Sequence, residues 1–248
     1  MDSSKTEKQE TAKHSKPSKR KLRWKRLAIW LLIDLTVAAL VFILLLYRPG
    51  RYDPMSPTGF KPGQVSPHLT LFHSDIYNGA QSGRPFDANL SEEGINDIIA
   101  RGGLDWDWPL EQDGVMLYAP AAVLEPGRLV LMGTANLKGV ELVVTIELQA
   151  NIGQKGLLSL KLGKFKVGAW NITPIAKLMA KKMYTEQVAA ANVDKDAWQT
   201  KIIASLLNDE PFDPLFRMPT DRMLKKRLRV EKVAIQEGKL SFRLIPVQ

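Results

Sequence analysis

The sequence predicts an α+β protein in which an N-terminal transmembrane helix precedes a curved antiparallel β-meander. Two to four helices pack with the meander, and a C-terminal β-hairpin closes the fold. Three observations predict this class: an apolar run long enough to cross a bilayer, several stretches with apolar residues at every second position, and apolar residues at helical spacing around them. Short turn signals separate the alternating stretches, which favours antiparallel neighbours.

The positive charge of the chain is concentrated in residues 1–26. The 248 residues carry a formal net charge of +9, and this segment holds ten Lys and Arg against three acidic residues. The rest of the chain is nearly neutral, so the basic residues form a tail and not a nucleic-acid-binding face. We expect no nucleic-acid partner, and we expect the tail to be cytoplasmic and close to anionic lipid headgroups.

Residues 27–47 are predicted to form the transmembrane helix. Leu27–Leu46 is a run of twenty residues with one charge, Asp34. A helix of that length rises about 30 Å, the thickness of one hydrocarbon core. A cleaved signal peptide would have a shorter apolar region and a small-residue cleavage site, but the sequence Tyr-Arg-Pro-Gly follows. An uncleaved signal-anchor is therefore the favoured interpretation.

The distribution of basic residues around the span predicts its orientation. Many precede it and few follow it, so the N-terminus should be inside and the rest of the chain outside the cytoplasmic (inner) membrane, as an extracytoplasmic or periplasmic domain. The absence of cysteine favours a bacterial envelope over a eukaryotic secretory pathway. For the intramembrane polar residue Asp34, two interpretations stay open: contact with a partner helix, or a tolerated protonated or hydrated carboxyl, which we favour.

Residues 48–68 are rich in proline and glycine, which predicts an extended linker outside the core. The folded domain then covers 69–248, which is enough chain to bury one core. Apolar spacing predicts a short helix over 69–81, and Ser91 is the predicted N-cap of a second helix that ends near Ala100.

Alternation with a period of two predicts the strands of the meander. The clearest strand is 140–150, where Val144, Ile146 and Leu148 share one face and polar residues occupy the other. In the last strand of the meander the phase of alternation changes at Gly163, which predicts a bulge or a sharp bend. Strands are predicted over 84–90, 115–124 (interrupted by Pro120), 129–137, 140–150 and 157–168, and the closing hairpin is formed by 228–235 and 240–244.

Two helices are predicted between the meander and the hairpin, one beginning at Thr173-Pro174 and one over about 196–207. A bent sheet opposite the apolar face of the first helix would leave a groove, for which methionine is an adaptable lining. The same residues would also pack together as ordinary core, so both interpretations stay open. The candidate groove residues are Val144, Ile146, Leu148, Ile175, Leu178, Met179 and Met183.

Known catalytic patterns are missing from the sequence. It contains no phosphate-binding glycine loop, dinucleotide fingerprint, zinc-protease motif or nucleophile elbow. His68 and His73 are five residues apart, the wrong spacing for a metal pair on one helix face. We therefore predict no enzyme, no catalytic residue, no metal and no cofactor.

A loop with two tryptophans, Trp106 and Trp108, is the most unusual local stretch of the chain. Such side chains can enter a membrane interface or stack on sugars, which makes the pair a candidate interface loop. The alternative, which we favour, is that the two rings close one end of the core.

Four segments carry a resemblance to a known group of proteins: Phe86–Ala100 with its LSEEGINDII, Val130–Ala135 (VLMGTA), Lys164–Pro174 (KFKVGAWNITP) and the closing hairpin. Together they resemble YpmS-like single-pass bacterial membrane proteins. The order of elements is also similar to that of LmeA-like envelope proteins and of tubular lipid-binding domains, in which a curved sheet wraps a long helix around an apolar groove. The resemblance implies lipid or amphiphile handling at the cell envelope.

Two functions follow as expectations. The first is a membrane-anchored, extracytoplasmic, non-enzymatic protein that binds or handles lipid or amphiphile, with the bilayer and a bound lipid as its partners. The second is an envelope scaffold or protein-interaction module without a groove, whose partner is another envelope protein. A hydrolase is disfavoured because no nucleophile motif is present.

Overall fold

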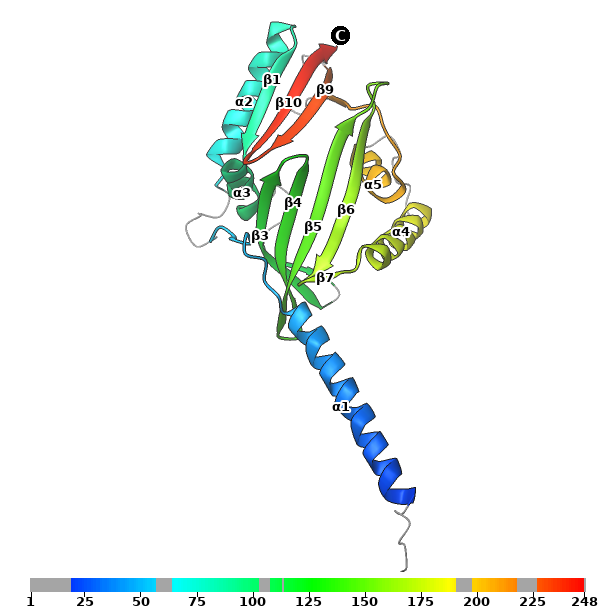
Figure 1. Cartoon of the computed structure of the whole chain (residues 1–248). Coiled ribbons are helices and arrows are strands. Elements are labelled where there is room, and N and C mark those ends of the chain that lie inside the picture. The colour runs from blue at the N-terminus through cyan, green and yellow to red at the C-terminus, as the bar shows by residue number, and fades with distance from the viewer. Residues whose placement is uncertain are drawn as a thin grey trace, which may run out of the picture. The chain divides into compact units, whose positions relative to one another are not determined.

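The computed structural model describes residues 19–56, 64–102, 108–112, 114–190, 198–217 and 227–247 (Figure 1). The chain divides into two units, Met1–Ile43 and Leu44–Gln248. The first unit holds most of helix α1 (Lys19–Leu45), and the second holds every other helix and strand that the structure describes. The predicted α+β class is confirmed.

Helix α1 contains the apolar segment that the sequence predicts to be a span. The segment Trp24–Leu45 has 22 residues, and a stretch of 18 residues within it reaches a mean hydropathy of 2.7, so it is long and apolar enough to cross a membrane. Asp34 lies on this helix with an exposed side chain. Two residues further on, the hydroxyl of Thr36 donates to the carbonyl of Leu32 at 2.8 Å, so it is satisfied within the helix itself. The segment is compatible with single-pass anchoring.

The second unit is built on two antiparallel sheets. A six-stranded meander has the order β2-β3-β4-β5-β6-β7, and a four-stranded sheet has the order β1-β10-β9-β8 (Figure 1). The strands are β1 (Phe86–Ser91), β2 (Leu110–Gln112), β3 (Val115–Glu125), β4 (Arg128–Leu137), β5 (Val140–Ile152), β6 (Leu158–Val167), β7 (Trp170–Asn171), β8 (Leu215–Arg217), β9 (Arg227–Gln236) and β10 (Lys239–Val247). The closing hairpin β9–β10 thus belongs to a separate sheet, whose edge strand β1 comes from far earlier in the chain.

Both irregularities predicted for the meander are present. The pairing of β3 with β4 shifts between Tyr118 and Ala121, at the predicted interruption by Pro120. In the β5–β6 pair, Glu147 and Leu148 face Lys164 and Leu162, so that Gly163 between them is left out of the register. A residue omitted from the ladder bends its strand, which is how a bulge curves a sheet.

Four helices pack against the sheets: α2 (Pro67–Ser82), α3 (Glu92–Ala100), α4 (Thr173–Ala190) and α5 (Trp198–Asn208). The predicted N-cap of α3 is confirmed, since the Ser91 hydroxyl accepts a hydrogen bond from the Gly94 amide at 3.0 Å. Helix α3 packs against β3, whereas α4 and α5 pack against β6 and against each other.

The six-stranded sheet is covered on both faces. On one face Leu124, which is fully buried, packs with Ile95 of α3 and with apolar residues of the β9–β10 hairpin. On the other face Val123 and its neighbours pack around Tyr52. Because adjacent strand residues point to opposite faces, Val123 and Leu124 belong to two separate cores.

Tyr52 fixes the segment that follows α1 to the sheet. Its side chain is only 5% exposed, its hydroxyl donates to the carbonyl of Ala119 at 2.7 Å, and it lies 2.7 Å from the hydroxyl of Thr134. The sequence predicts 48–68 as a linker outside the core, and the burial of Tyr52 corrects that expectation at this end. Proline content alone does not reveal that one aromatic residue anchors the segment.

Candidate functional site

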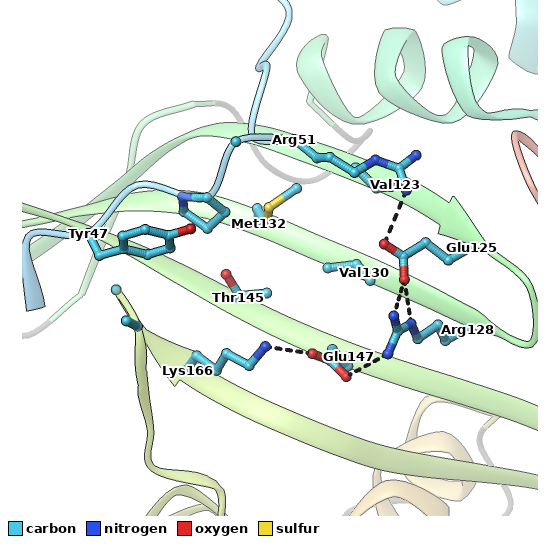
Figure 2. A pocket seen from close by; sticks show the side chains of 14 residues that line it. Tyr47, Arg51, Val123, Glu125, Arg128, Val130, Met132, Thr145, Glu147 and Lys166 are labelled. Carbon is cyan, nitrogen blue, oxygen red and sulfur yellow. Dashed lines mark hydrogen bonds and ion pairs between the residues drawn. The ribbon is translucent and has the colours of Figure 1, made fainter. Parts of the chain in front are cut away.

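A cleft of about 480 Å³ lies on the face of the meander that Tyr52 helps to cover (Figure 2). This volume is within the range of small-molecule binding sites. Its floor comes from β3 to β6, and its wall comes from the segment that directly follows α1 and from the turn after β6. The lining residues are Tyr47, Pro49, Gly50, Arg51, Val123, Glu125, Arg128, Val130, Met132, Thr145, Glu147, Lys166, Gly168 and Ala169.

Strand register explains why the floor residues gather on one face. Val130 of β4 lies opposite Glu147 of β5, and Met132 lies opposite Thr145. In the next pair of strands, Thr145 lies opposite Lys166. Residues directly opposite in an antiparallel pair project to the same side, so two neighbouring rows across the sheet supply both apolar and charged groups.

Glu147 is the central charged group of the floor. Its side chain is 10% exposed, and its carboxylate lies 2.8 Å from the ammonium of Lys166, 3.6 Å from the guanidinium of Arg128 and 3.9 Å from the ammonium of Lys164. Burial acts to raise the pKa of Glu147, but the hydrogen bond and charge of Lys166, with the charges of Lys164 and Arg128, outweigh it and lower that pKa. An ionised carboxylate held by three cations is a weak general base.

The ion pairs continue along the rim of the cleft. Figure 2 shows one line that runs from Arg51 through Glu125 and Arg128 to Glu147 and Lys166. Arg51 contacts Glu125 at 3.1 Å, and Arg128 bridges the two glutamates. The rim therefore presents anionic and cationic groups in alternation, a pattern suited to a ligand that carries both signs of charge.

Thr145 contributes a buried hydroxyl without a partner. The residue is 5% exposed, and its Oγ1 makes no hydrogen bond within the described part of the chain. An unpaired buried hydroxyl costs about 1–3 kcal/mol, so a polar group of a ligand at this point would recover that energy. The same floor also offers the apolar side chains of Val123, Val130 and Met132.

The predicted groove residues do not gather at this cleft. Ile146 and its strand neighbours Val144 and Leu148 are half-buried on the opposite face of β5, where Ile146 pairs with Leu131 and Phe165. The four helix residues are 47–72% exposed on α4, and neither they nor the three sheet residues line the cleft. These four are Ile175, Leu178, Met179 and Met183.

The other predicted site residues lie apart from the cleft. Trp106 lies outside the described residues. Trp108 is half-buried, and its indole Nε1 donates to the carbonyl of Ile99 at 2.6 Å, so its ring packs at the end of α3. Among the described residues, no group of three or more His, Cys, Asp or Glu side chains is placed to hold a metal ion.

Sequence reasoning missed the charged residues of the cleft. A signal for them was present in two predicted strands. Thr145 and Glu147 are two residues apart on one strand, and Lys164 and Lys166 are two residues apart on the next, so each pair lies on one face of its strand. Complementary charges at every second position of consecutive strands favour cross-strand pairing. The contribution of Arg51 had no such signal, because it depends on how the segment after α1 folds back.

Acid is expected to destabilise this unit through Glu147. The pKa of Glu147 in the folded state is below the ordinary value of 4.5, so the unfolded state binds more protons in mild acid. The stability that the ionised carboxylate contributes is complete above the ordinary value. It is lost as pH falls through the folded-state pKa. We expect Glu147→Gln to be less stable than wild type at neutral pH and to lose less stability between about pH 5 and pH 3. Urea unfolding across this pH range measures the stability of both proteins. Equal losses of stability in wild type and Glu147→Gln would contradict the role given to Glu147. Asp97, whose pKa is also lowered, is common to both proteins.

Comparisons with family models, with curated proteins and with solved structures find no match to this chain.

Proposed function

We propose that this protein is a single-pass, membrane-anchored, non-enzymatic domain that binds or handles a lipid or a related amphiphile at the cell envelope. The observation that carries the proposal is the lining of the cleft, where an apolar floor adjoins charged groups of both signs. Lipids combine the same two chemistries. Part of the lining, Tyr47 to Arg51, directly follows the apolar segment in the chain.

The chemistry of the lining favours a zwitterionic headgroup. Lys166 and Arg128 offer cations to a phosphate, and Glu125 offers an anion to an ammonium group. These three side chains keep between a fifth and two fifths of their surface exposed. Each can therefore contact a ligand while it keeps its present ion-pair partner. The hydroxyl of Thr145 would bond an ester or phosphate oxygen, and the acyl portion would lie on Met132 and its apolar neighbours.

Location and orientation belong to the same proposal. The basic tail 1–26 is cytoplasmic by the positive-inside rule, and the Leu44–Gln248 unit is extracytoplasmic at the inner membrane. The short stretch between Leu46 and Tyr52 keeps the cleft wall within a few residues of the bilayer boundary, because an extended chain covers only about 3.5 Å per residue. A ligand that leaves the bilayer would therefore meet the cleft early.

Native mass spectrometry of the full chain, released from detergent after extraction from membranes, tests the proposal. Wild type is expected to retain close to one lipid per chain, and Lys166→Gln to retain about tenfold less, since a charge-assisted hydrogen bond contributes about 1.5–3 kcal/mol. Thr145→Val, which keeps the shape of the side chain, is expected to lower occupancy without loss of stability.

Lys161→Gln is the matched control, because Lys161 is an exposed lysine of the same strand that does not line the cleft. Lipid held around α1 is equally present in all variants, so only the differences between them report on the cleft. A bare protein mass, or equal occupancy in all four proteins, would contradict lipid binding. Full occupancy by a co-purified envelope protein instead would favour the scaffold.

The scaffold function is the second candidate, and a separate observation favours it. Helix α4 exposes four large apolar side chains in a row, and such patches on folded domains mark interaction sites. If another protein covers this face, the scaffold function is favoured; if a membrane covers it, the face is part of the anchoring of the domain.

A further inference from the structure

We infer that the exposed apolar face of α4 docks on an anionic bilayer surface, the surface of the same membrane that α1 enters. This face consists of Ile175, Leu178, Met179 and Met183, which follow one another at spacings of three, one and four residues. That spacing places all four on one side of a helix. The inference does not depend on whether the cleft holds a lipid.

The face is exposed to an unusual degree and has lysines on the same helix. Its four apolar side chains are 56%, 72%, 60% and 47% exposed, although residues of this kind are ordinarily buried. The exposed Lys181 and Lys182 and the half-buried Lys177 lie on the same helix, and Glu186, which pairs with Lys182 at 3.9 Å, is its one acidic residue over the part whose side chains are described. An anionic bilayer offers an apolar layer to the exposed apolar side chains and counter-charges to the lysines.

The start of α4 is tied to the end of the apolar segment. The amide of Ala169 donates to the carbonyl of Leu44 at 2.8 Å, and the amide of Gly168 donates to the carbonyl of Val143 at 2.7 Å. The turn after β6 is therefore fixed at Leu44, one of the last residues of that segment.

Trp170 comes directly after that turn and is half exposed, as interfacial tryptophans are. Thr173, where α4 begins, accepts a hydrogen bond from the Phe165 amide at 2.7 Å, which holds the helix start to β6. Three residues lie between Ala169 and Thr173, so these two residues are at most about 14 Å apart when the chain is extended. The first turn of α4 therefore begins no more than about 14 Å from the turn that is fixed at the end of the apolar segment, which keeps it near the membrane interface.

The lysines favour a lipid surface over a second copy of the chain. A dimer formed through this face would bring the lysines of two helices together, and like charges in contact are destabilising. An anionic bilayer instead offers many counter-charges and an apolar layer beneath them. The four apolar side chains and the lysines then both find the surroundings that they favour.

Spin labels on the full chain in vesicles test the inference. The sequence has no cysteine, so Met179→Cys gives a single labelling site on this face, and Lys239→Cys gives an exposed control site on β10. In vesicles that contain phosphatidylglycerol, we expect the label at 179 to be accessible to oxygen and shielded from a water-soluble nickel complex. The label at 239 should show the reverse.

Replacing Lys177, Lys181 and Lys182 together by glutamine is expected to lower the docked fraction about tenfold or more, with a smaller change in vesicles of phosphatidylcholine alone. Equal nickel access at 179 and 239 would overturn the inference, because the face would then be in water. Spin–spin broadening at 179 that disappears on dilution with unlabelled chain would also overturn it, since a second copy would then cover the face. Protection of 179 from oxygen as well as from the nickel complex would overturn it too, because a site packed against the protein itself is closed to both reagents.

Discussion

Gly168→Ala is expected to lower the stability of the Leu44–Gln248 unit by about 3 kcal/mol or more, a fall in melting temperature of about 10 °C for a unit of this size. Two physical effects add at this position. The backbone of Gly168 has φ = +58°, a left-handed conformation that costs an alanine about 1 kcal/mol. An added Cβ would also collide with the carbonyl oxygens of Leu44 and Leu45, which are backbone atoms and cannot rotate away.

Gly83→Ala is the matched control for this change. Gly83 has φ = +66° at the end of α2, and a Cβ there would meet nothing within 4 Å. Gly83→Ala should therefore lower the stability only by the cost of placing an alanine in the left-handed conformation, about 1 kcal/mol. Thermal unfolding of the full chain in detergent compares the two variants, and equal losses would mean that the contact between Gly168 and the end of α1 does not contribute.

Tyr52→Ala is expected to cost about 3–5 kcal/mol, because it removes a buried aromatic ring from the core on the cleft side of the meander. Tyr52→Phe separates the ring from its hydroxyl. It leaves the half-buried carbonyl of Ala119 without that donor, so we expect a loss of about 1–2 kcal/mol. Chemical unfolding followed by tryptophan fluorescence measures both changes.

Tyr77→Ala is a control of the same chemistry, since Tyr77 is an exposed residue of α2. Tyr77→Ala should change the free energy of unfolding by less than about 0.5 kcal/mol. The cleft provides a second readout, because Tyr52 holds the segment that forms its wall. If Tyr52→Ala matched Tyr77→Ala in stability, the segment would be a loose linker after all.

Local patterns were sufficient to predict most elements of the fold. The alternation through Val144, Ile146 and Leu148 predicted β5, Ser91 predicted the start of α3, and Gly163 predicted the bulge in β6. Each of these signals depends on residues that are close in sequence. The pairing of β1 with β10 joins residues that are far apart in the sequence, and no local sequence pattern indicated it.

The site was harder to predict because burial depends on what covers a face. The alternation in β5 indicated one apolar face, yet Thr145 and Glu147 on the other face are also buried. The segment fixed by Tyr52 covers that face, and the lysines of β6 compensate the charge of Glu147. On α4 the opposite error arose, since the apolar stripe that reads as core lies exposed, with none of the described elements packed over it.

The pairing of β1 with β10 also sets the order in which the chain can fold. Phe86 lies opposite Leu244, so β1 leaves the ribosome long before its partner strand is made. Until β9 and β10 emerge, β1 is an unpaired strand, and the Leu124 side of the meander lacks the hairpin that covers it. Such contacts between distant residues form late and slowly, and they leave apolar surface and strand edges open to misassociation in the meantime. The interval between the synthesis of β1 and that of β10 is therefore the stage at which the growing chain is most open to misassociation.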